Sequence, residues 1–266
     1  MIFAWLQHIL PLHFISRCVG ALARSERTWI RSPFIRLFKW YFDVDLQLAE
    51  REHPSDYQSF NDFFTRRLKP SLREPSGLLS APADGRISAC GRIEDNTMIQ
   101  AKGKSFLVSD LLGQVDHPFG LGSFSTTYLS PRDYHRVHFP CAGMLEEATY
   151  IPGKLFSVNQ QTTQYVDRLF ARNERLVMHL STEHGAMALV LVGAAIVAAI
   201  KPFWQSETLR AGTAYTKGFN QLEVHQGQEA GQFLLGSTVI LITERAFEWQ
   251  AAPGDLIEMG WSMLRS

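Results

Sequence analysis

Gly236-Ser237-Thr238 directly precedes an apolar stretch near the end of the chain. A serine that follows glycine can attack the carbonyl just before it, because glycine adds no steric bulk and tolerates unusual dihedrals. The amide becomes an ester, and loss of the serine α-proton then expels the upstream carboxylate. The resulting dehydroalanine hydrolyses to a pyruvoyl group with loss of ammonia, so the chain would be cut between Gly236 and Ser237. By itself the tripeptide also suits a common turn in which a hydroxyl bonds the backbone.

Such an attack needs a base for the hydroxyl proton and a group that orients this base. His135 and His138 lie within residues 128–140, and Asp84 precedes Gly85. If residues 136–139 are extended, the two histidines project to opposite faces, so we expect them to have different tasks. The structural alternatives are hydrogen-bonded histidines and a turn role for Asp84.

A metal-dependent hydrolase is another interpretation of the same residues. His135, His138 and Cys141 recur at intervals of three, with Asp84 nearby in the sequence. Zinc sites use histidine and cysteine, but no second ligand pair at a recognised spacing is present, and we expect no metal. Cys18, Cys90 and Cys141 are odd in number and widely spaced, which predicts no disulfide framework and favours a reducing compartment.

The first 70 residues are predicted to be helical, because apolar residues recur at helical spacing after capping signals. Ser32-Pro33 suggests a helix start, and Ser59 with Asp62 resembles a capping box for a helix through Leu68. The residues expected to share one face of the first of these helices are Ile30, Phe34, Leu37, Phe38 and Tyr41.

From Pro70 onward short apolar stretches are interrupted by Gly, Pro, Asp and Asn, which predicts a β-rich domain with a mostly antiparallel sheet. The fold class is therefore α+β. The predicted strands are residues 85–93, 124–128, 136–139, 146–151, 175–180, 187–200 and 238–243. The longest apolar run, residues 185–200, is shorter than the roughly 20 residues of a membrane-spanning helix and suggests two buried strands joined by a bend at Gly193.

The charge balance excludes a general affinity for nucleic acid. The 266 residues contain 26 basic and 26 acidic side chains, so no basic field covers the molecule. In residues 1–40, however, there are six Lys and Arg residues and a single acidic residue, Glu26. Aromatic residues are interleaved with them: Trp5, Phe14, Trp29, Phe34, Phe38 and Trp40. This pattern is typical of a helix at an anionic membrane surface, although a helical layer packed on the catalytic core fits equally well. The first residues lack the features of a signal peptide, and we expect no export.

Taken together, six spaced motifs resemble the phosphatidylserine decarboxylase family over nearly the whole chain. They are Phe60-Asn-Asp-Phe-Phe-Thr-Arg-Arg-Leu-Lys-Pro70, Pro82-Ala-Asp-Gly85, Tyr134-His-Arg-Val-His138, Phe170-Ala-Arg-Asn-Glu-Arg175, Leu191-Val-Gly-Ala194 and Leu235-Gly-Ser-Thr238. Two positions depart from the family pattern: Gln226-Gly227 replaces a Lys-Gly pair, and Ala198 replaces a common glycine.

The resemblance implies that Asp84, His138 and Ser237 form a self-processing triad and that Ser237 becomes the pyruvoyl cofactor. His135 is implied as an acid or base in decarboxylation. The pyruvoyl carbonyl would form a Schiff base with phosphatidylserine and act as electron sink, giving phosphatidylethanolamine. An unperturbed histidine, with a pKa of about 6.5, suits the final protonation.

The same resemblance sets the expected organisation and location. Residues 1–70 would be a membrane-associating helical segment and residues 71–266 the decarboxylase domain. Cleavage would give a β chain, 1–236, and an α chain, 237–266, that stay associated as a heterodimer. Assembly into a higher oligomer is a further possibility. The expected location is the cell membrane, peripherally and on the cytoplasmic side. A pyruvoyl decarboxylase of a soluble amino acid and a non-catalytic β module remain alternatives.

Overall fold

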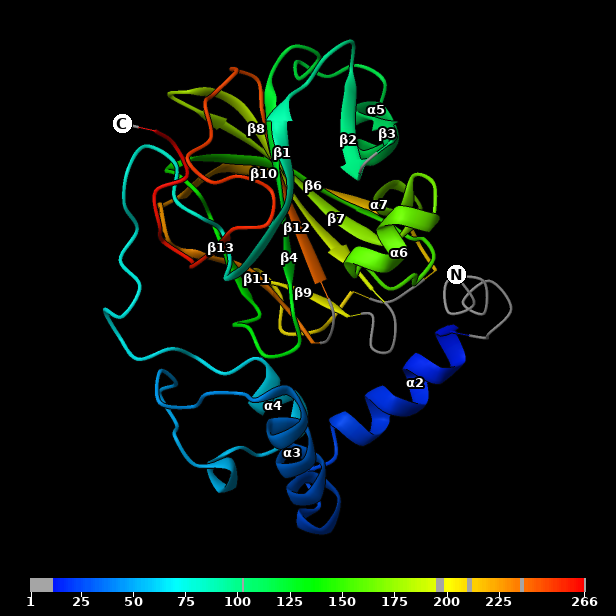
Figure 1. Cartoon of the computed structure of the whole chain (residues 1–266), viewed down its shortest axis with the longest axis vertical. Helices are drawn as coiled ribbons and strands as arrows, with labels where there is room; N and C mark the ends of the chain where they lie inside the picture. The colour runs from blue at the N-terminus through cyan, green and yellow to red at the C-terminus, as the bar shows by residue number, and fades with distance from the viewer. Residues whose placement is uncertain (1–11, 102, 195–198, 210–211, 235–236, 266) are drawn as a thin grey trace.

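The computed structural model describes residues 12–101, 103–194, 199–209, 212–234 and 237–265 (Figure 1). Its helices are α2 (Leu12–Ala23), α3 (Thr28–Phe42), the 3₁₀ turn η1 (Pro54–Asp56), α4 (Phe60–Phe64), α5 (Val108–Leu112), α6 (Gln160–Tyr165) and α7 (Leu169–Arg172). Its strands are β1 (Gly85–Arg92), β2 (Thr97–Ala101), β3 (Lys104–Leu107), β4 (Ser123–Leu129), β5 (Arg136–His138), β6 (Gly143–Ile151), β7 (Arg175–Thr182), β8 (Gly185–Gly193), β9 (Ile200–Pro202), β10 (Tyr215–Val224), β11 (Glu229–Phe233), β12 (Ser237–Thr243) and β13 (Leu256–Ile257).

Within these residues the main sheet has eight strands in the order β10-β6-β7-β8-β12-β4-β1-β13, and every pair is antiparallel. A smaller sheet has the order β5-β11-β9, and β2 and β3 form a hairpin. The helices are mostly N-terminal. The predicted α+β class and antiparallel sheet are therefore confirmed.

The main sheet is buried on both faces because side chains alternate along its strands. One face carries Leu191 and Val239 and packs against apolar residues of the small sheet such as Val137 and Phe233. The other face, which carries Ile240, is covered by another group of buried residues that includes Leu111, Leu169 and Phe170. A side chain of β12 therefore points into a dry interior whichever face it is on.

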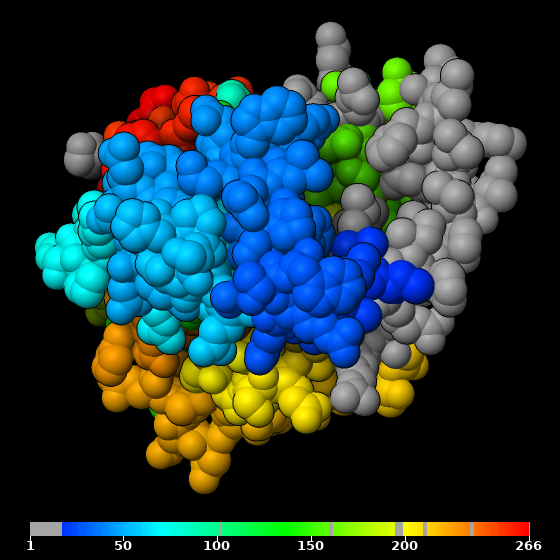
Figure 2. All heavy atoms as spheres, turned by 90° about the horizontal axis from the view of Figure 1, so that it is seen from below, coloured from blue at the N-terminus to red at the C-terminus, as the bar shows by residue number. Residues whose placement is uncertain are grey.

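The N-terminal helices form a layer with a core of its own below the sheets in Figure 1. Ile35 and Phe38 of α3 pack with the phenylalanines of α4, and the Phe34 and Phe60 rings stack with centroids 4.1 Å apart. Figure 2 shows this layer across the centre of the lower face. Among the described residues, no helix combines the length and the apolar character needed to cross a bilayer.

Two expectations about the helices are wrong. The helix predicted to start at Ser32 begins at Thr28, and Pro33 lies inside it. A proline inside a helix removes a single backbone hydrogen bond, and the preceding turn is kept by Ile30 and Arg31, whose amides bond to the Arg27 carbonyl. The helix predicted to reach Leu68 ends at Phe64, although its Ser59 cap is confirmed, with Oγ accepting from the Asp62 amide.

The buried stripe of α3 also differs from the predicted face. Phe34, Ile35 and Phe38 face the core, whereas Leu37 and Tyr41 are exposed. The reason is that α4 packs against the side of α3 that carries Ile35, which the apolar spacing alone did not single out.

The predicted strands 85–93, 124–128, 136–139, 146–151, 175–180 and 238–243 match β1, β4, β5, β6, β7 and β12. The run 185–200 contains β8, which ends at Gly193 and is buried from Met187 on. The second strand of this run begins only at Ile200, and β9 belongs to the small sheet. Ala198 lies outside the described residues.

Candidate active site

Ser237 is the first residue of β12 and is fully buried. Its Cα pairs with Leu129 of β4 on one side and with Gly193 of β8 on the other. It shares its face of the sheet with Val239, so it points toward the small sheet. No hydrogen-bond partner for its Oγ exists in the described part of the chain. Gly236 lies outside the described residues. A buried hydroxyl without a partner is costly in a folded protein, and Ser125 on β4 and Thr238 on β12 share this feature.

His138 ends β5 and is held in one tautomer. Its Nδ1 lies 2.7 Å from the carbonyl oxygen of Gly227, which can only accept, so Nδ1 carries the proton. Its Nε2 is then an acceptor for the Tyr134 hydroxyl at 3.0 Å. Burial lowers the pKa of His138, and the bond to Gly227 opposes this in part. The ring is therefore neutral at pH 7 and presents a basic nitrogen.

The loop that holds His138 depends on a glycine and on Gln226. Gly227 has φ +77°, and a Cβ there would lie 2.2 Å from Cγ of Pro75, so other residues are excluded by strain and by space. Gln226, which replaces the lysine of the family pattern, donates to the carbonyls of Gly77 and Pro140 at 3.0 and 3.1 Å. A neutral side chain thus fixes the turn at this position.

Asp84 lies just before β1, next to the segment of His138. The His138 amide donates to the carbonyl of Pro82 at 2.8 Å, which brings the two segments together. The Asp84 carboxylate accepts from the Met259 amide at 2.7 Å and lies 3.4 Å from Arg73. Among the described contacts no hydrogen bond joins Asp84 to His138 or Ser237. Burial raises the pKa of Asp84, and the bond to Met259 and the charge of Arg73 oppose this rise.

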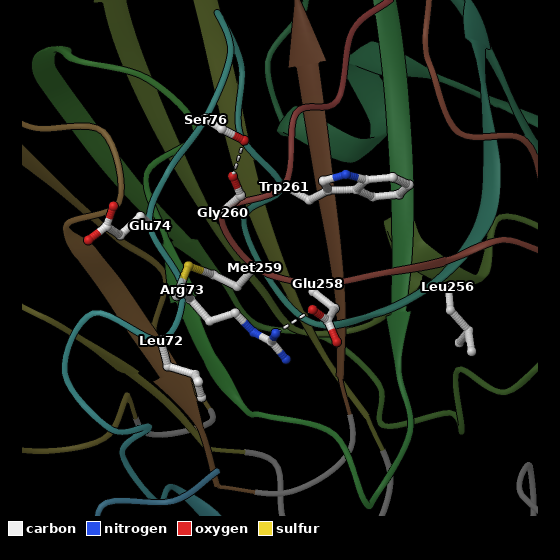
Figure 3. A pocket seen from close by; sticks show the side chains of 9 residues that line it. All are labelled: Leu72, Arg73, Glu74, Ser76, Leu256, Glu258, Met259, Gly260 and Trp261. Atoms are coloured by element: carbon white, nitrogen blue, oxygen red, sulfur yellow. Dashed lines mark hydrogen bonds and ion pairs between the residues drawn. The ribbon is translucent and has the colours of Figure 1, made fainter.

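Arg73 and Met259, which contact Asp84, line a pocket of about 470 Å³ (Figure 3). Arg73 also bridges Asp84 to Glu258. The pocket lining also includes Leu72, Glu74, Ser76, Leu256, Gly260 and Trp261. Two segments that are distant in the sequence, one before β1 and one around β13, therefore hold the carboxylate of Asp84 in place.

His135 is fully buried and contacts different elements from His138. Its Nδ1 lies 2.8 Å from the carbonyl oxygen of Asp133, its Nε2 has no partner in the described part of the chain, and its ring lies 4.0 Å from that of Phe64. Burial lowers its pKa to about 3, with a smaller effect of Arg66 in the same direction and an opposing one from the bond to Asp133. The expectation of a histidine titrating near 6.5 is thus wrong for this state, because the site is dry. The ring is neutral, with an open acceptor nitrogen.

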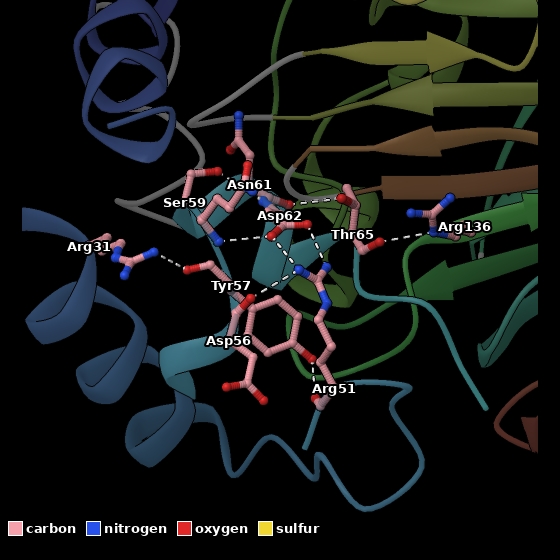
Figure 4. A network of polar contacts seen from close by, with 10 residues as sticks. Arg31, Arg51, Asp56, Tyr57, Ser59, Asn61, Asp62, Thr65 and Arg136 are labelled. Carbon is pink, nitrogen blue, oxygen red and sulfur yellow. Dashed lines mark hydrogen bonds and ion pairs between the residues drawn. The ribbon is translucent and has the colours of Figure 1, made fainter. Parts of the chain in front are cut away.

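Arg66 is a buried residue of the first motif. Its side chain donates to the carbonyls of Arg132 and Asp133 at 2.6 and 3.1 Å, so it shares Asp133 with His135. Nearby, Arg136 bonds the carboxylate of Glu229 in β11 and, through Nε, the carbonyl of Thr65 at 2.9 Å (Figure 4). The helical layer and the histidine loop are therefore joined by two arginines, Arg66 from the first motif and Arg136 from the motif that carries the histidines.

The residues that a metal site would need, His135, His138 and Cys141, contact different parts of the protein. Cys141 Sγ lies 3.6 Å from Sδ of Met187, whereas His135 faces Phe64 and His138 faces Tyr134. In the described ranges no three His, Cys, Asp or Glu side chains are placed to hold an ion. Asp84 and His138 lie on segments that the bond from the His138 amide to Pro82 joins, and Ser237 lies on β12.

Comparisons with known proteins identify the family of the chain. A family model for phosphatidylserine decarboxylase matches residues 60–265, and a second model, described as PSD, matches residues 2–43. A phosphatidylserine decarboxylase proenzyme of Acinetobacter baumannii (strain SDF) is 47% identical over 256 residues, which cover 92% of this chain and 88% of the relative. Proenzymes of the same name from Acinetobacter baylyi and Stutzerimonas stutzeri are 45% and 46% identical, over 96% and 89% of this chain and 92% and 84% of their own lengths. With a family model over most of its length and relatives of this identity and coverage, the chain belongs to the phosphatidylserine decarboxylase family.

Proposed function

We propose that this chain is a proenzyme that cuts itself between Gly236 and Ser237 and then decarboxylates phosphatidylserine to phosphatidylethanolamine. The observation that carries the proposal is the fully buried hydroxyl of Ser237, which has no hydrogen-bond partner among the described residues, in a member of this family. A group derived from this side chain needs little room, and Gly193 beside it adds no side chain. The surroundings of Ser237 therefore suit a pyruvoyl group.

In the self-cleavage, His138 takes the proton of the Ser237 hydroxyl. Its neutral ring and the acceptor state of Nε2 support this role. Asp84, held by Arg73 and Met259, contributes negative charge to the segment beside His138. Because the carboxylate is engaged elsewhere, the ring of His138 is oriented by the carbonyl of Gly227.

The two products should stay together. β12 pairs along its whole length with β8 on one side and β4 on the other, and all its residues are buried. β13, on the same product, pairs with β1. The α chain would thus remain a central strand of the sheet after the cut.

In decarboxylation, the pyruvoyl carbonyl supplies an electron sink for the electron pair released with carbon dioxide. His135 is the proposed acid or base at the reacting carbon of the substrate. As a neutral ring in a dry site it accepts a proton or hydrogen bond at Nε2 first and donates afterwards. The carbonyl of Asp133 keeps Nδ1 protonated throughout.

The lipid substrate would be reached from the helical layer. The outer side of α3 exposes apolar and aromatic side chains, including Trp29 at 72% and Trp40 at 77%, and exposed arginines such as Arg36 lie among them. This composition suits peripheral binding to an anionic bilayer. Phe34 and Phe38, also expected at the membrane, belong to the core instead. The expected cytoplasmic side of the membrane stays a prediction.

An intact mass spectrum under denaturing conditions tests the proposal. The wild-type protein should give two fragments divided at Ser237, the smaller lighter by one ammonia than a peptide that starts with serine. Ser237→Ala should stay uncut. Ser125→Ala removes another buried strand hydroxyl that has no partner in the described ranges, and it should be cut normally. An uncut wild type refutes the proposal. Release of carbon dioxide from soluble amino acids, and none from phosphatidylserine in mixed micelles, would favour the soluble-substrate alternative.

A further inference from the structure

Glu174 is a buried carboxyl group that the proposed mechanism does not use. It lies immediately before β7 and is 1% exposed. Its Oε2 accepts from the hydroxyl of Tyr150 at 3.0 Å, and its Oε1 has no partner in the described part of the chain. Leaving one oxygen of a buried carboxyl unpaired is costly. The arrangement therefore needs an explanation beyond packing.

The sheet register places this carboxyl beside Ser237. Gly193 pairs with Ser237 on one side, and its amide donates to the carbonyl of Glu174 at 2.9 Å on the other. Residues opposite each other in antiparallel strands carry their side chains on the same face. The three residues thus form one row across β7, β8 and β12, with a glycine in the middle.

The carboxyl extends over this glycine toward Ser237. A Cβ built on Gly193 would lie 3.0 Å from both Cγ and Oε1 of Glu174, so the acid occupies the space that a side chain would fill. Directly opposite residues have Cβ positions only about 5 Å apart. No side chain of β8 therefore separates Oε1 from Ser237.

The α-hydrogen of Ser237 points toward Gly193, the residue over which the carboxyl of Glu174 lies. The Glu244 amide bonds the Ala186 carbonyl, so that pair is hydrogen-bonded across β12 and β8. Hydrogen-bonded and non-hydrogen-bonded pairs alternate, and the register has no shift over the seven residues to Ser237. The Ser237–Gly193 pair is thus non-hydrogen-bonded, with the two Cα atoms about 4.5 Å apart and their hydrogens facing each other.

The electrostatic surroundings give the carboxyl a useful basicity. Burial raises the pKa of Glu174 to about 7, and the hydrogen bond from Tyr150 opposes this rise. Tyr150, with Tyr215 behind it, is the titratable group packed against the acid from the neighbouring strands. A base whose pKa lies near the working pH is the most effective one for proton transfer.

We propose that Glu174 is the base that removes the α-proton of Ser237 during self-cleavage, an inference that rests on the proposed function. After the hydroxyl has attacked and the ester has formed, Oε1 accepts the α-proton. The Cα–H electron pair becomes the Cα=Cβ double bond, and the Cβ–Oγ bond breaks, so that Oγ leaves in the carboxylate of Gly236. Water then replaces the nitrogen of the resulting dehydroalanine, which releases ammonia. His138 and Glu174 would thus serve two successive proton transfers.

The variant Glu174→Gln separates these steps. The amide keeps the size of the side chain and can still accept from Tyr150, but it cannot take up a proton. We expect the ester to form and to accumulate, with self-cleavage slowed at least 100-fold. Hydroxylamine cleaves esters and should cut this variant at Ser237 to give a small fragment that begins with serine. The matched control is Glu146→Gln, an exposed carboxylate on β6, which should mature like the wild type.

Each outcome decides the inference. Maturation of Glu174→Gln to a pyruvoyl end at the wild-type rate overturns it, and so does an uncut variant that resists hydroxylamine, because the block then lies before the ester. A wild type that never matures refutes the proposed function instead. If Glu174→Gln does not fold, Gly193→Ala carries the same test, since the added methyl group displaces the carboxyl. The hydroxylamine-sensitive ester should then accumulate, and normal maturation would contradict the inference.

Discussion

At the scale of single residues, the surroundings decide what each histidine can do. His135 and His138 lie three positions apart, and both have their Nδ1 proton fixed by a backbone carbonyl. Nε2 of His138 meets the Tyr134 hydroxyl, whereas Nε2 of His135 meets no partner in the described residues. His138 is therefore ready to accept a proton from within the protein, and His135 is ready to accept one from a bound substrate.

Substitution should separate the two roles. His138→Ala or Asp84→Ala should leave the chain uncut, because the hydroxyl attack loses its base or the charge beside it. His135→Asn should be cut, since an amide nitrogen can replace Nδ1 as donor to Asp133, but its decarboxylation should fall about 10²- to 10⁴-fold, as expected for loss of an acid or base. Denaturing gels report the cut, and carbon dioxide release reports turnover. An uncut His135→Asn protein would contradict this division.

The pH dependence of stability should show opposite contributions from His135 and Glu174. The pKa of His135 is lowered to about 3 by burial, so the unfolded chain binds more protons below about pH 6.5 and stability falls with decreasing pH. The pKa of Glu174 is raised to about 7, so the folded chain binds more protons between its unfolded value and pH 7, and stability falls with increasing pH. Each slope is at most about 1.4 kcal/mol per pH unit.

Urea unfolding of the uncut Ser237→Ala protein between about pH 5 and pH 7 measures these slopes. Adding His135→Asn should reduce the loss of unfolding free energy on acidification, and adding Glu174→Gln should increase it. Identical pH slopes in all three proteins would show that neither group titrates as its burial requires.

At the scale of elements, sequence patterns identified the strands that are apolar enough to be buried. β8 and β12 are nearly continuous apolar runs, and both were predicted. β10 was missed because most of its residues are exposed and polar, and its pairing with β6 shifts between Gly218 and Leu222. The helix predicted to reach Leu68 was too long: α4 ends at Phe64, where Thr65 caps it and bonds the carbonyl of Asn61. For β10 it is the long-range pairing with β6, which local patterns do not contain, that forms the strand.

The candidate site follows the same rule. Ser237, Asp84 and the two histidines could be named from their motifs, but the partners that define their chemistry could not. The carbonyl of Gly227 and the amide of Met259 come from distant loops. Glu174 is 63 positions from Ser237 in the chain, and only the register of three strands makes them neighbours.

The position of β12 predicts how the cut protein behaves. With both edges of the strand paired and its side chains buried, the α chain should not dissociate. Gel filtration of the matured protein in buffer should give one species that contains both chains, and the chains should separate only at urea concentrations that unfold the sheet. Release of the α chain in buffer would show that β12 leaves the sheet on cleavage.

At the scale of the whole molecule, the helical layer lies between the proposed membrane surface and the active site. Arg66 joins this layer to the loop of His135, and Arg136 joins it to β5 and β11. A lipid bound at α3 would therefore lie on the side of the molecule where the histidine loop begins. The apolar side chains exposed on this helix include Trp29, Leu37, Trp40 and Tyr41.

Removing this apolar surface should weaken membrane binding without changing the core. The full-length variant Trp29→Ser/Trp40→Ser should bind vesicles that contain anionic lipid at least tenfold more weakly in flotation, because each exposed indole loses its place in the headgroup region. Its self-cleavage should be normal. The control Val115→Ser/Leu121→Ser removes side chains that are 84% and 79% exposed but lie before β4, at the end of the sheet away from α3. Equal binding of both variants would place the membrane contact elsewhere on the protein.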